Sequence, residues 1–342
     1  MAGMRGISER KMNEIWYGDR PPPLWLRGLE PAYRIGNGVD RWWKSRRRPA
    51  DLEAACIIVV GNITVGGSGK SPLVIRLCRI LSEAGLRPGV ISRGYGRTGT
   101  GLRLVSTASD ASLVGDEPLM IAQEAGVPVI VSPDRCAAAR ALIRKGVKVI
   151  VSDDGLQHYR LPRAIEICVI DGSRGFGNGR LLPAGPLREP LERLASVDHV
   201  VVNGNPTHLP IGLEATPMTL AAGLLRPLEG GPGWRLSQFA GCQVNAVAGI
   251  ANPQRFFDLL RHARIKVIEY PFPDHHAYAT GDFEGMSGNL PILMTEKDAV
   301  KARKLGLANA WFLTVEAVLP SDWEARVLQQ VHACLEHRGS RP

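Results

Sequence analysis

A glycine-rich segment near residue 61 has the residue types and the spacing that bind phosphate groups. It reads Gly-Asn-Ile-Thr-Val-Gly-Gly-Ser-Gly-Lys-Ser over residues 61–71, after an apolar run and before a helix-like stretch. Glycines let backbone N–H groups turn toward phosphate oxygens, and the positive end of the following helix adds to the attraction. In such a P-loop the lysine reaches the β- and γ-phosphates and the final serine can hold Mg²⁺. The residues predicted to form this site are Thr64, Val65, Gly66, Gly67, Ser68, Gly69, Lys70 and Ser71.

The segment departs from the strict P-loop pattern at one position. Thr64 stands five residues before Gly69, where the pattern has glycine. A glycine-rich turn without a ligand is the alternative, but the apolar run before it and the helix after it favour a P-loop. Val65 stands where ATPases that partition or target other proteins carry a signature lysine, which disfavours that subclass.

Two pairs of acidic residues lie beside predicted regular elements, one pair after an apolar run and the other before a helix-like stretch. Asp153 and Asp154 follow the apolar run 147–152, where an aspartate can order Mg²⁺ or its water; a solvated Asp-Gly turn is the alternative. Asp116 and Glu117 precede a helix-like stretch. They could supply a general base for a substrate hydroxyl, but on these residues alone a helix N-terminus stabilised by acids is favoured.

Two further segments carry residues suited to catalysis. Residues 273–278 read Pro-Asp-His-His-Ala-Tyr, in which a histidine could hold or tune a carboxylate across a cleft. Residues 177–190 contain many glycines and prolines and form no regular element. Long loops of this kind are often functional, and the planar guanidinium of Arg188 could bind a phosphate or simply pair with Glu189.

The elements that must position these residues follow an α/β pattern. Apolar runs at 56–60, 89–92, 127–132, 147–152, 165–170 and 199–203 alternate with helix-like stretches at 71–84, 117–125, 136–145 and 190–196. This alternation predicts a mostly parallel, P-loop NTPase-like sheet covered by helices, with ligands at the carboxyl ends of the strands. A second, smaller α/β series follows. We expect an N-terminal segment over 1–48, a P-loop domain over 49–204, a linker or crossover over 205–240 and a smaller domain over 241–338.

Composition excludes several classes of protein. The chain has 342 residues, 44% of them hydrophobic and 22% charged, which is typical of a globular protein. Six scattered cysteines argue against a disulfide framework, and we find neither a secretory signal nor an apolar run long enough to span a membrane.

The net charge is +9, but residues 1–50 hold eleven Lys and Arg against five Asp and Glu. A basic excess gathered at one end indicates an anionic surface there rather than nucleic acid.

The N-terminal segment has the pattern of an amphipathic helix. Arg27, Arg34 and Arg41 recur every seven residues on one stripe, and Arg46, Arg47 and Arg48 follow it. Apolar residues fall on the opposite side, namely Trp25, Leu29, Ala32, Ile35, Val39, Trp42 and Trp43. This pattern predicts a helix that lies in the headgroup layer of an anionic membrane. The alternative is a helix that packs on the protein's own core.

The ordered set of motifs resembles the tetraacyldisaccharide 4′-kinase family, the lipid A 4′-kinases of Gram-negative bacteria. The resemblance covers about residues 13–335 and rests on VGNITVGGSGKSP (60–72), SRGYGR (92–97), GDEP (115–118), DDGLQH (153–158), DGSRGFGNGRLLPAGPLREP (171–190), DHHAY (274–278) and TEKDAVK (295–301). It implies transfer of the γ-phosphoryl group of ATP to the 4′-hydroxyl of tetraacyldisaccharide 1-phosphate, which gives lipid IVA. It also implies a peripheral enzyme on the cytoplasmic face of the inner membrane, with ATP and Mg²⁺ as its cofactors.

The resemblance also implies roles for particular residues. Asp116 would be the catalytic base, paired with His275 from the smaller domain, and Lys70 and Arg188 would stabilise the transferring phosphoryl group. Ser71 and one of Asp153 and Asp154 would hold Mg²⁺. Residues expected to bind or support the substrate are Glu117, Arg135, His158 and Glu189. The acylated disaccharide and the membrane surface are the expected partners; neither a nucleic acid nor an obligate protein partner is expected.

A P-loop GTPase or metallochaperone is the second hypothesis. It requires an Asn-Lys-x-Asp motif that reads guanine, and the nearest segment, Thr-Glu-Lys-Asp over residues 295–298, lacks the asparagine. A nucleic-acid-binding module is the third hypothesis, suggested only by the sequence pI of about 9.5.

Overall fold

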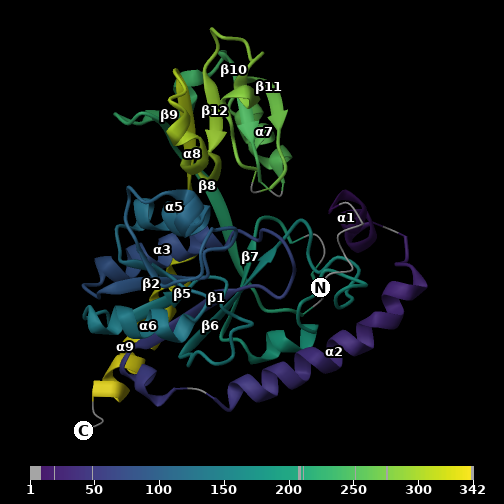
Figure 1. The fold of residues 1–342 in the computed structure, drawn as a ribbon, viewed down its shortest axis with the longest axis vertical. Helices are drawn as coiled ribbons and strands as arrows, with labels where there is room; N and C mark the ends of the chain where they lie inside the picture. Colours follow the sequence, from purple (N-terminus) through teal and green to yellow (C-terminus); the bar gives the residue numbers. More distant parts are fainter. Residues whose placement is uncertain are drawn as a thin grey trace.

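A mixed β-sheet runs through the whole molecule and joins a larger half to a smaller one (Figure 1). The computed structural model describes residues 9–18, 20–47, 49–206, 209–210, 212–250, 252–274 and 276–339. Within this part of the chain the strand order is β11-β10-β12-β13-β8-β7-β6-β1-β5-β2-β4-β3, and β9 pairs with β8. The long strand β8 therefore belongs to both halves.

The larger half is built on parallel strands, apart from the antiparallel edge strand β3. Its strands are β1 (Cys56–Gly61), β2 (Pro88–Ser92), β3 (Arg103–Val105), β4 (Val129–Val131), β5 (Val149–Ser152), β6 (Ile165–Asp171), β7 (His199–Asn203) and the start of β8 (Thr216–Pro227). In β1, Ile58 lies level with Val151 of β5 and Ile165 of β6. The central strands are fully buried, which explains their nearly continuous apolar sequences.

Helices cover both faces of this half. One face carries α3 (Lys70–Glu83), α5 (Asp116–Ala125) and α9 (Ser321–Gly339), preceded by the short α4 (Ala111–Val114); the other carries α6 (Arg135–Arg144) with the 3₁₀ helices η2 (Ala50–Ala54) and η3 (Leu191–Ser196). Successive strand residues alternate between these layers, so that Ile58 packs with α3 while Ile57 packs with α6. Figure 1 shows these helices around the sheet.

The smaller half repeats this arrangement on a smaller scale. Its elements are β9 (Trp234–Arg235), η4 (Leu236–Phe239), β10 (Gln243–Ala248), α7 (Pro253–His262), β11 (Lys266–Pro271), η5 (Thr280–Phe283), β12 (Ile292–Thr295), α8 (Glu296–Ala302), η6 (Arg303–Leu305) and β13 (Ala310–Val318). The β10, β11, β12 and β13 strands are parallel. Phe257 of α7 packs on one face against Ala246, and Ala299 of α8 packs on the other against Val247.

Two expected domain boundaries differ from the structure. The segment 205–240 contains strand β8, whose residues 216–218 pair with β7 and whose residues 219–227 pair with β13. The prolines and glycines of this segment indicated a linker, but part of it forms the strand that joins the two halves. The closing helix α9 leaves the smaller half, because Trp323 and Val327 are buried in the core of the larger half.

Two helices precede the first strand. In α1 (Glu9–Tyr17), Met12 and Trp16 are buried, and the indole of Trp16 donates a hydrogen bond to the Pro183 carbonyl (3.1 Å). Helix α1 thus packs on the loop that contains Pro183, and residues 1–8 lie outside the described part. Helix α2 (Leu24–Ser45) runs along the outside of the larger half (Figure 1). Among the described residues, no helix is both long enough and apolar enough to cross a membrane.

Candidate active site

The predicted phosphate loop joins β1 to α3. Gly66 and Gly69 have positive φ angles of 106° and 86°, which side chains disfavour. A Cβ on Gly69 would lie 2.4 Å from the side-chain amide nitrogen of Asn203, so only glycine fits there. Thr64 does not need the freedom of the missing glycine, because it forms an isolated antiparallel bridge with Leu187.

The predicted acidic pair forms a turn after β5, beside the phosphate loop. Asp154 lies 3.5 Å from Nζ of Lys70 and 3.3 Å from Nη1 of Arg188. Burial opposes its charge, but these two cations lower the pKa of Asp154 to about 2. Burial raises the pKa of Asp153 to about 6, with the charges of Glu117 and Asp154 adding to the effect. Ser92 donates a hydrogen bond to Oδ2 of Asp153, whereas Oδ1 is buried and accepts none from the described residues.

The loop that carries Arg188 lies directly against the phosphate loop. The Arg188 N–H donates to the Ile63 carbonyl (2.7 Å), and the Val65 N–H donates to the Pro186 carbonyl (2.9 Å). The guanidinium of Arg188 contacts both Asp154 and the side-chain oxygen of Gln157. The fold therefore brings Arg188, which the sequence analysis singled out, to the same carboxylate as Lys70.

The GDEP segment opens α5, and its acidic residues face the smaller half. Gly115 has φ 94°, and a Cβ there would lie 3.2 Å from Cα of Gly94, so the two loops pack backbone to backbone. Nζ of Lys297, from α8, lies 3.4 Å from Glu117 and 3.1 Å from Asp274. Burial opposes the charge of Lys297, yet the neighbouring carboxylates raise its pKa, and Asp116 contributes to this effect.

The histidine expected to partner Asp116 cannot be placed. His275 lies outside the described residues. The preceding residue, Asp274, is brought next to GDEP by Lys297. The following residue, His276, pairs with Asp282 (3.0 Å) and packs against Phe272, so its contacts stabilise its own loop.

The supporting residues predicted from sequence lie mainly beneath the site. Arg135 is buried at the start of α6 and donates to the backbone carbonyls of Asp153 and Asp154, so it fixes the acidic turn. Glu189 is 1% exposed, which leaves no surface for a substrate contact. It accepts hydrogen bonds from Gln157 and Tyr159 and pairs with a buried arginine, Arg193.

His158 belongs to a cluster that resembles a metal site. Its ring lies near Asp134 and Cys136, and their potential ligand atoms are within 4.8 Å of one another. Burial and the charge of Arg135 lower the pKa of His158 to about 4, so its ring is neutral at pH 7. Asp134, however, caps α6 by accepting from two backbone N–H groups, and burial raises the pKa of the Cys136 thiol. A capping carboxylate and a protonated thiol explain the cluster without a metal.

Sequence reasoning missed the residues that connect the site to its surroundings. Asn203, at the end of β7, donates to the Ser68 carbonyl (3.2 Å) and so shapes the phosphate loop. Arg255 of α7 pairs with Asp171 at the end of β6 (3.0 Å), which adds an ion pair between the halves to the one that Lys297 forms. The available signal was position, because Asp171 and Asn203 each end a buried strand at the same edge of the sheet.

These features define a class of protein. A P-loop at the first strand, an acidic turn at a neighbouring strand and converging Lys and Arg side chains are the parts of a P-loop phosphotransferase. The model of the family "Tetraacyldisaccharide-1-P 4′-kinase" matches residues 24–332, and the chain belongs to this family. The resemblance expected from sequence is thereby confirmed.

Relatives and a solved structure agree with this assignment. The tetraacyldisaccharide 4′-kinase of Alkalilimnicola ehrlichii is 48% identical over 87% of this chain and 90% of its own. That of Xanthomonas euvesicatoria is 44% identical over 95% of this chain and 96% of its own. The structure of LpxK from Aquifex aeolicus in complex with ATP has a TM-score of 0.75 and 26% identity, covering 90% of this chain and 98% of that one. The α/β fold and the kinase class expected from the sequence are confirmed.

Proposed function

We propose that this chain transfers the γ-phosphoryl group of ATP to the 4′-hydroxyl of tetraacyldisaccharide 1-phosphate, which yields lipid IVA and ADP. The observation that supports this most directly is the meeting of the phosphate loop, Asp154 and Arg188 at one edge of the sheet. The charge of Glu117 in the GDEP segment acts on Asp153 in this group, and its carboxylate also pairs with Lys297 of the smaller half. The site thus has a nucleotide side and an acceptor side, as a two-substrate transfer requires.

Asp116 is the base in this proposal. The acceptor oxygen bonds to the γ-phosphorus as the bond to the β–γ bridging oxygen breaks, and the hydroxyl proton passes to the Asp116 carboxylate. The ammonium group of Lys297 lies beside this group of carboxylates and balances part of their negative charge. His275, which lies outside the described residues, would orient Asp116 or share its proton.

Lys70 and Arg188 stabilise the charge of the transferring phosphoryl group. Both now contact Asp154, which holds the two cations side by side in readiness for phosphate oxygens. Electrostatic stabilisation of this kind supplies most of the acceleration in phosphoryl transfer.

The residues present fit a Mg²⁺ ion. Asp153 offers a buried carboxylate oxygen that accepts no hydrogen bond from the described residues, and Ser71 stands at the start of α3. Asp154 is already neutralised by two cations, so Asp153 is the better candidate ligand, directly or through water. When bound, Mg²⁺ would neutralise charge on the β- and γ-phosphates.

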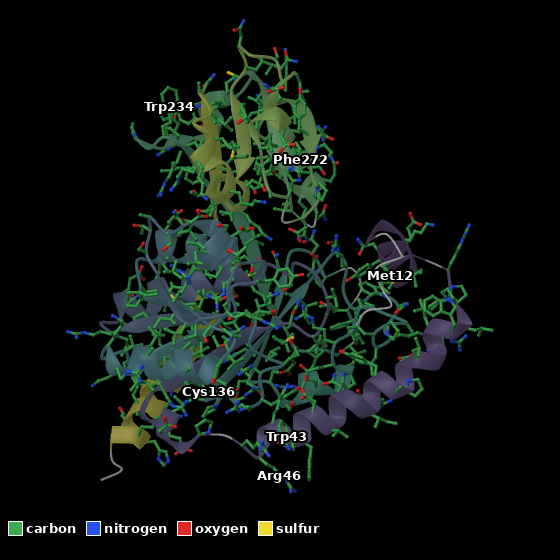
Figure 2. All side chains as sticks on the ribbon, viewed as in Figure 1. Met12, Trp43, Arg46, Cys136, Trp234 and Phe272 are labelled. Atoms are coloured by element: carbon green, nitrogen blue, oxygen red, sulfur yellow. The ribbon has the colours of Figure 1, made fainter. Side chains whose placement is uncertain are left out.

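Helix α2 is the proposed contact with the membrane surface. Its apolar side points away from the protein, and the outward residues Leu24, Trp25, Leu29, Ile35, Val39, Trp42 and Trp43 are 47–79% exposed. This exposure favours contact with a surface over packing of this side on the protein's own core. Arg46 and Arg47 stack on Trp42 and Trp43, and Figure 2 shows Trp43 and Arg46 on the outer side of the helix. Indoles beside guanidinium groups suit an anionic lipid surface, and the use of ATP places it on the cytoplasmic face of the inner membrane.

Labelled ATP tests the reaction. The protein, γ-³²P-ATP and tetraacyldisaccharide 1-phosphate in detergent micelles should give a labelled lipid whose added phosphate maps to the 4′ position. Label that stays in inorganic phosphate, or a strong preference for GTP, would contradict the proposal.

Sedimentation with anionic vesicles tests the membrane contact. Ile35→Ser/Val39→Ser should weaken binding, and equal sedimentation of variant and wild type would refute the proposed surface.

A further inference from the structure

Helix α2 also holds the backbone of a residue in the proposed active site. The hydroxyl of Tyr33 donates to the Arg188 carbonyl at 3.1 Å, and the side-chain amide of Asn37 donates to the same oxygen. A carbonyl oxygen has two lone pairs, so these two donors use its full accepting capacity. Burial raises the pKa of the Tyr33 phenol, which keeps its hydroxyl protonated as a donor.

The same peptide is bonded to the phosphate loop on its other side. The Arg188 N–H donates to the Ile63 carbonyl, and Leu187 bridges Thr64. A continuous series of contacts therefore leads from α2 through residue 188 to the loop that would hold ATP. Between its two bonded backbone groups, Arg188 extends its side chain to Asp154.

A second contact fixes α2 to the same loop, one turn before Tyr33. Glu30 accepts a hydrogen bond from the Leu181 N–H (2.9 Å) and pairs with Arg180 (3.1 Å). Glu30, Tyr33 and Asn37 recur at helical spacing on one side of α2, opposite the exposed apolar side. One side of the helix thus serves the active-site loop, while the other is free for a surface.

We infer that Tyr33 and Asn37 are positioning residues that set Arg188 for phosphoryl transfer. This inference rests on the role proposed for Arg188. It also links surface binding to catalysis, because α2 contains Pro31 and three glycines at positions 28, 36 and 38, which weaken a helix on its own. A bilayer that stabilises α2 from the apolar side also stabilises the donors that hold Arg188.

The test is a set of variants assayed with detergent-dispersed acceptor, so that vesicle binding plays no part. Tyr33→Phe/Asn37→Ala should lower kcat about tenfold, as expected for a misplaced catalytic group. The KM values for ATP and acceptor should change little. Asp40→Asn, which removes an ion pair that closes within α2 on Lys44, is the matched control and should retain the wild-type rate. Tyr33→Phe alone keeps the packed ring and should show part of the same fall in kcat.

A double-mutant cycle separates positioning from general destabilisation. In an Arg188→Ala background the helix variants should cause no further loss, since the group that they position is absent. An equal tenfold loss in that background, or a fully active Tyr33→Phe/Asn37→Ala enzyme, would overturn the inference. A fully active Arg188→Ala enzyme would overturn the proposed role of Arg188 and the inference with it. Loss in Arg188→Ala but not in the helix variants would overturn the inference alone.

Discussion

Replacement of Lys297 by methionine tests how the two halves of the molecule cooperate. Methionine has a similar length without the charge. The ammonium group lies 3.1 Å from Asp274 and 3.4 Å from Glu117, and its side chain is 16% exposed. The substitution therefore leaves the carboxylates of Asp116, Glu117 and Asp274 without this cation at the junction between the halves.

The magnitude follows from the longer of these distances and from Coulomb's law. Even with the dielectric constant of water, a unit charge 3.4 Å away contributes about 1.2 kcal/mol, and a half-buried site increases this value. Because about 1.36 kcal/mol corresponds to a tenfold change in rate, loss of the cation should lower the rate of transfer about tenfold. The carboxylates of the two halves then repel one another at the junction that the cation had held together.

The assay is the rate of transfer from labelled ATP to detergent-dispersed acceptor. Lys297→Arg keeps the charge and should retain most of the wild-type rate. Lys301→Met removes a lysine from the same helix, but its partner Asp298 belongs to the smaller half, so it should lower stability without the tenfold loss of rate. A wild-type rate in Lys297→Met, or an equal loss of rate in Lys301→Met, would refute the reasoning.

Three further changes have defined outcomes. Lys70→Ala should reduce transfer at least about a hundredfold in a protein with a native circular-dichroism spectrum, because it removes a cation from the phosphoryl site; near-normal transfer would refute the P-loop assignment. Burial and the nearby Glu124 carboxylate raise the pKa of Glu296 from 4.5 to about 8, so the folded protein binds more protons between these values and loses stability as pH rises through them. The glutamine of Glu296→Gln cannot ionise. The Tm of this variant relative to that of the wild type should therefore rise as the pH increases from about 5 to about 8.5. A difference in Tm that does not change with pH would contradict this. Gly38→Ala, where a Cβ meets nothing within 4 Å, should stabilise α2 by about 0.5–1 kcal/mol and slow hydrogen exchange of its amides; unchanged exchange would count against it.

The phosphate-binding side of the site was predictable because it depends on local chemistry. A buried strand, a glycine-rich turn and a helix place Lys70 without help from the rest of the chain. Asp153 and Asp154 were predictable for the same reason, since parallel strands bring their carboxyl ends to one edge. The helical pattern of α2 was also evident, but the sequence left open whether its apolar side is exposed or packed on the core.

The connections between distant segments were not predictable in this way. The pairing of β8 with both β7 and β13 depends on partners about 15 and about 95 residues away, and no local pattern encodes it. The ion pair of Lys297 with Glu117 joins residues of two halves. The bonds from Tyr33 and Asn37 to Arg188 span about 150 residues, and they use polar residues that would otherwise be interpreted as solvent-facing.

The most direct test of the account is a comparison of Asp116→Ala with the wild type in two measurements on the same preparation. One is the dissociation constant for ATP, and the other is the single-turnover rate of transfer to the acceptor lipid. The account predicts a loss of about 10²–10⁴ in the rate, the range supplied by a general base, with ATP affinity almost unchanged. If ATP affinity falls in parallel with the rate, Asp116 belongs to the nucleotide or metal site and the proposed division of the active site is wrong.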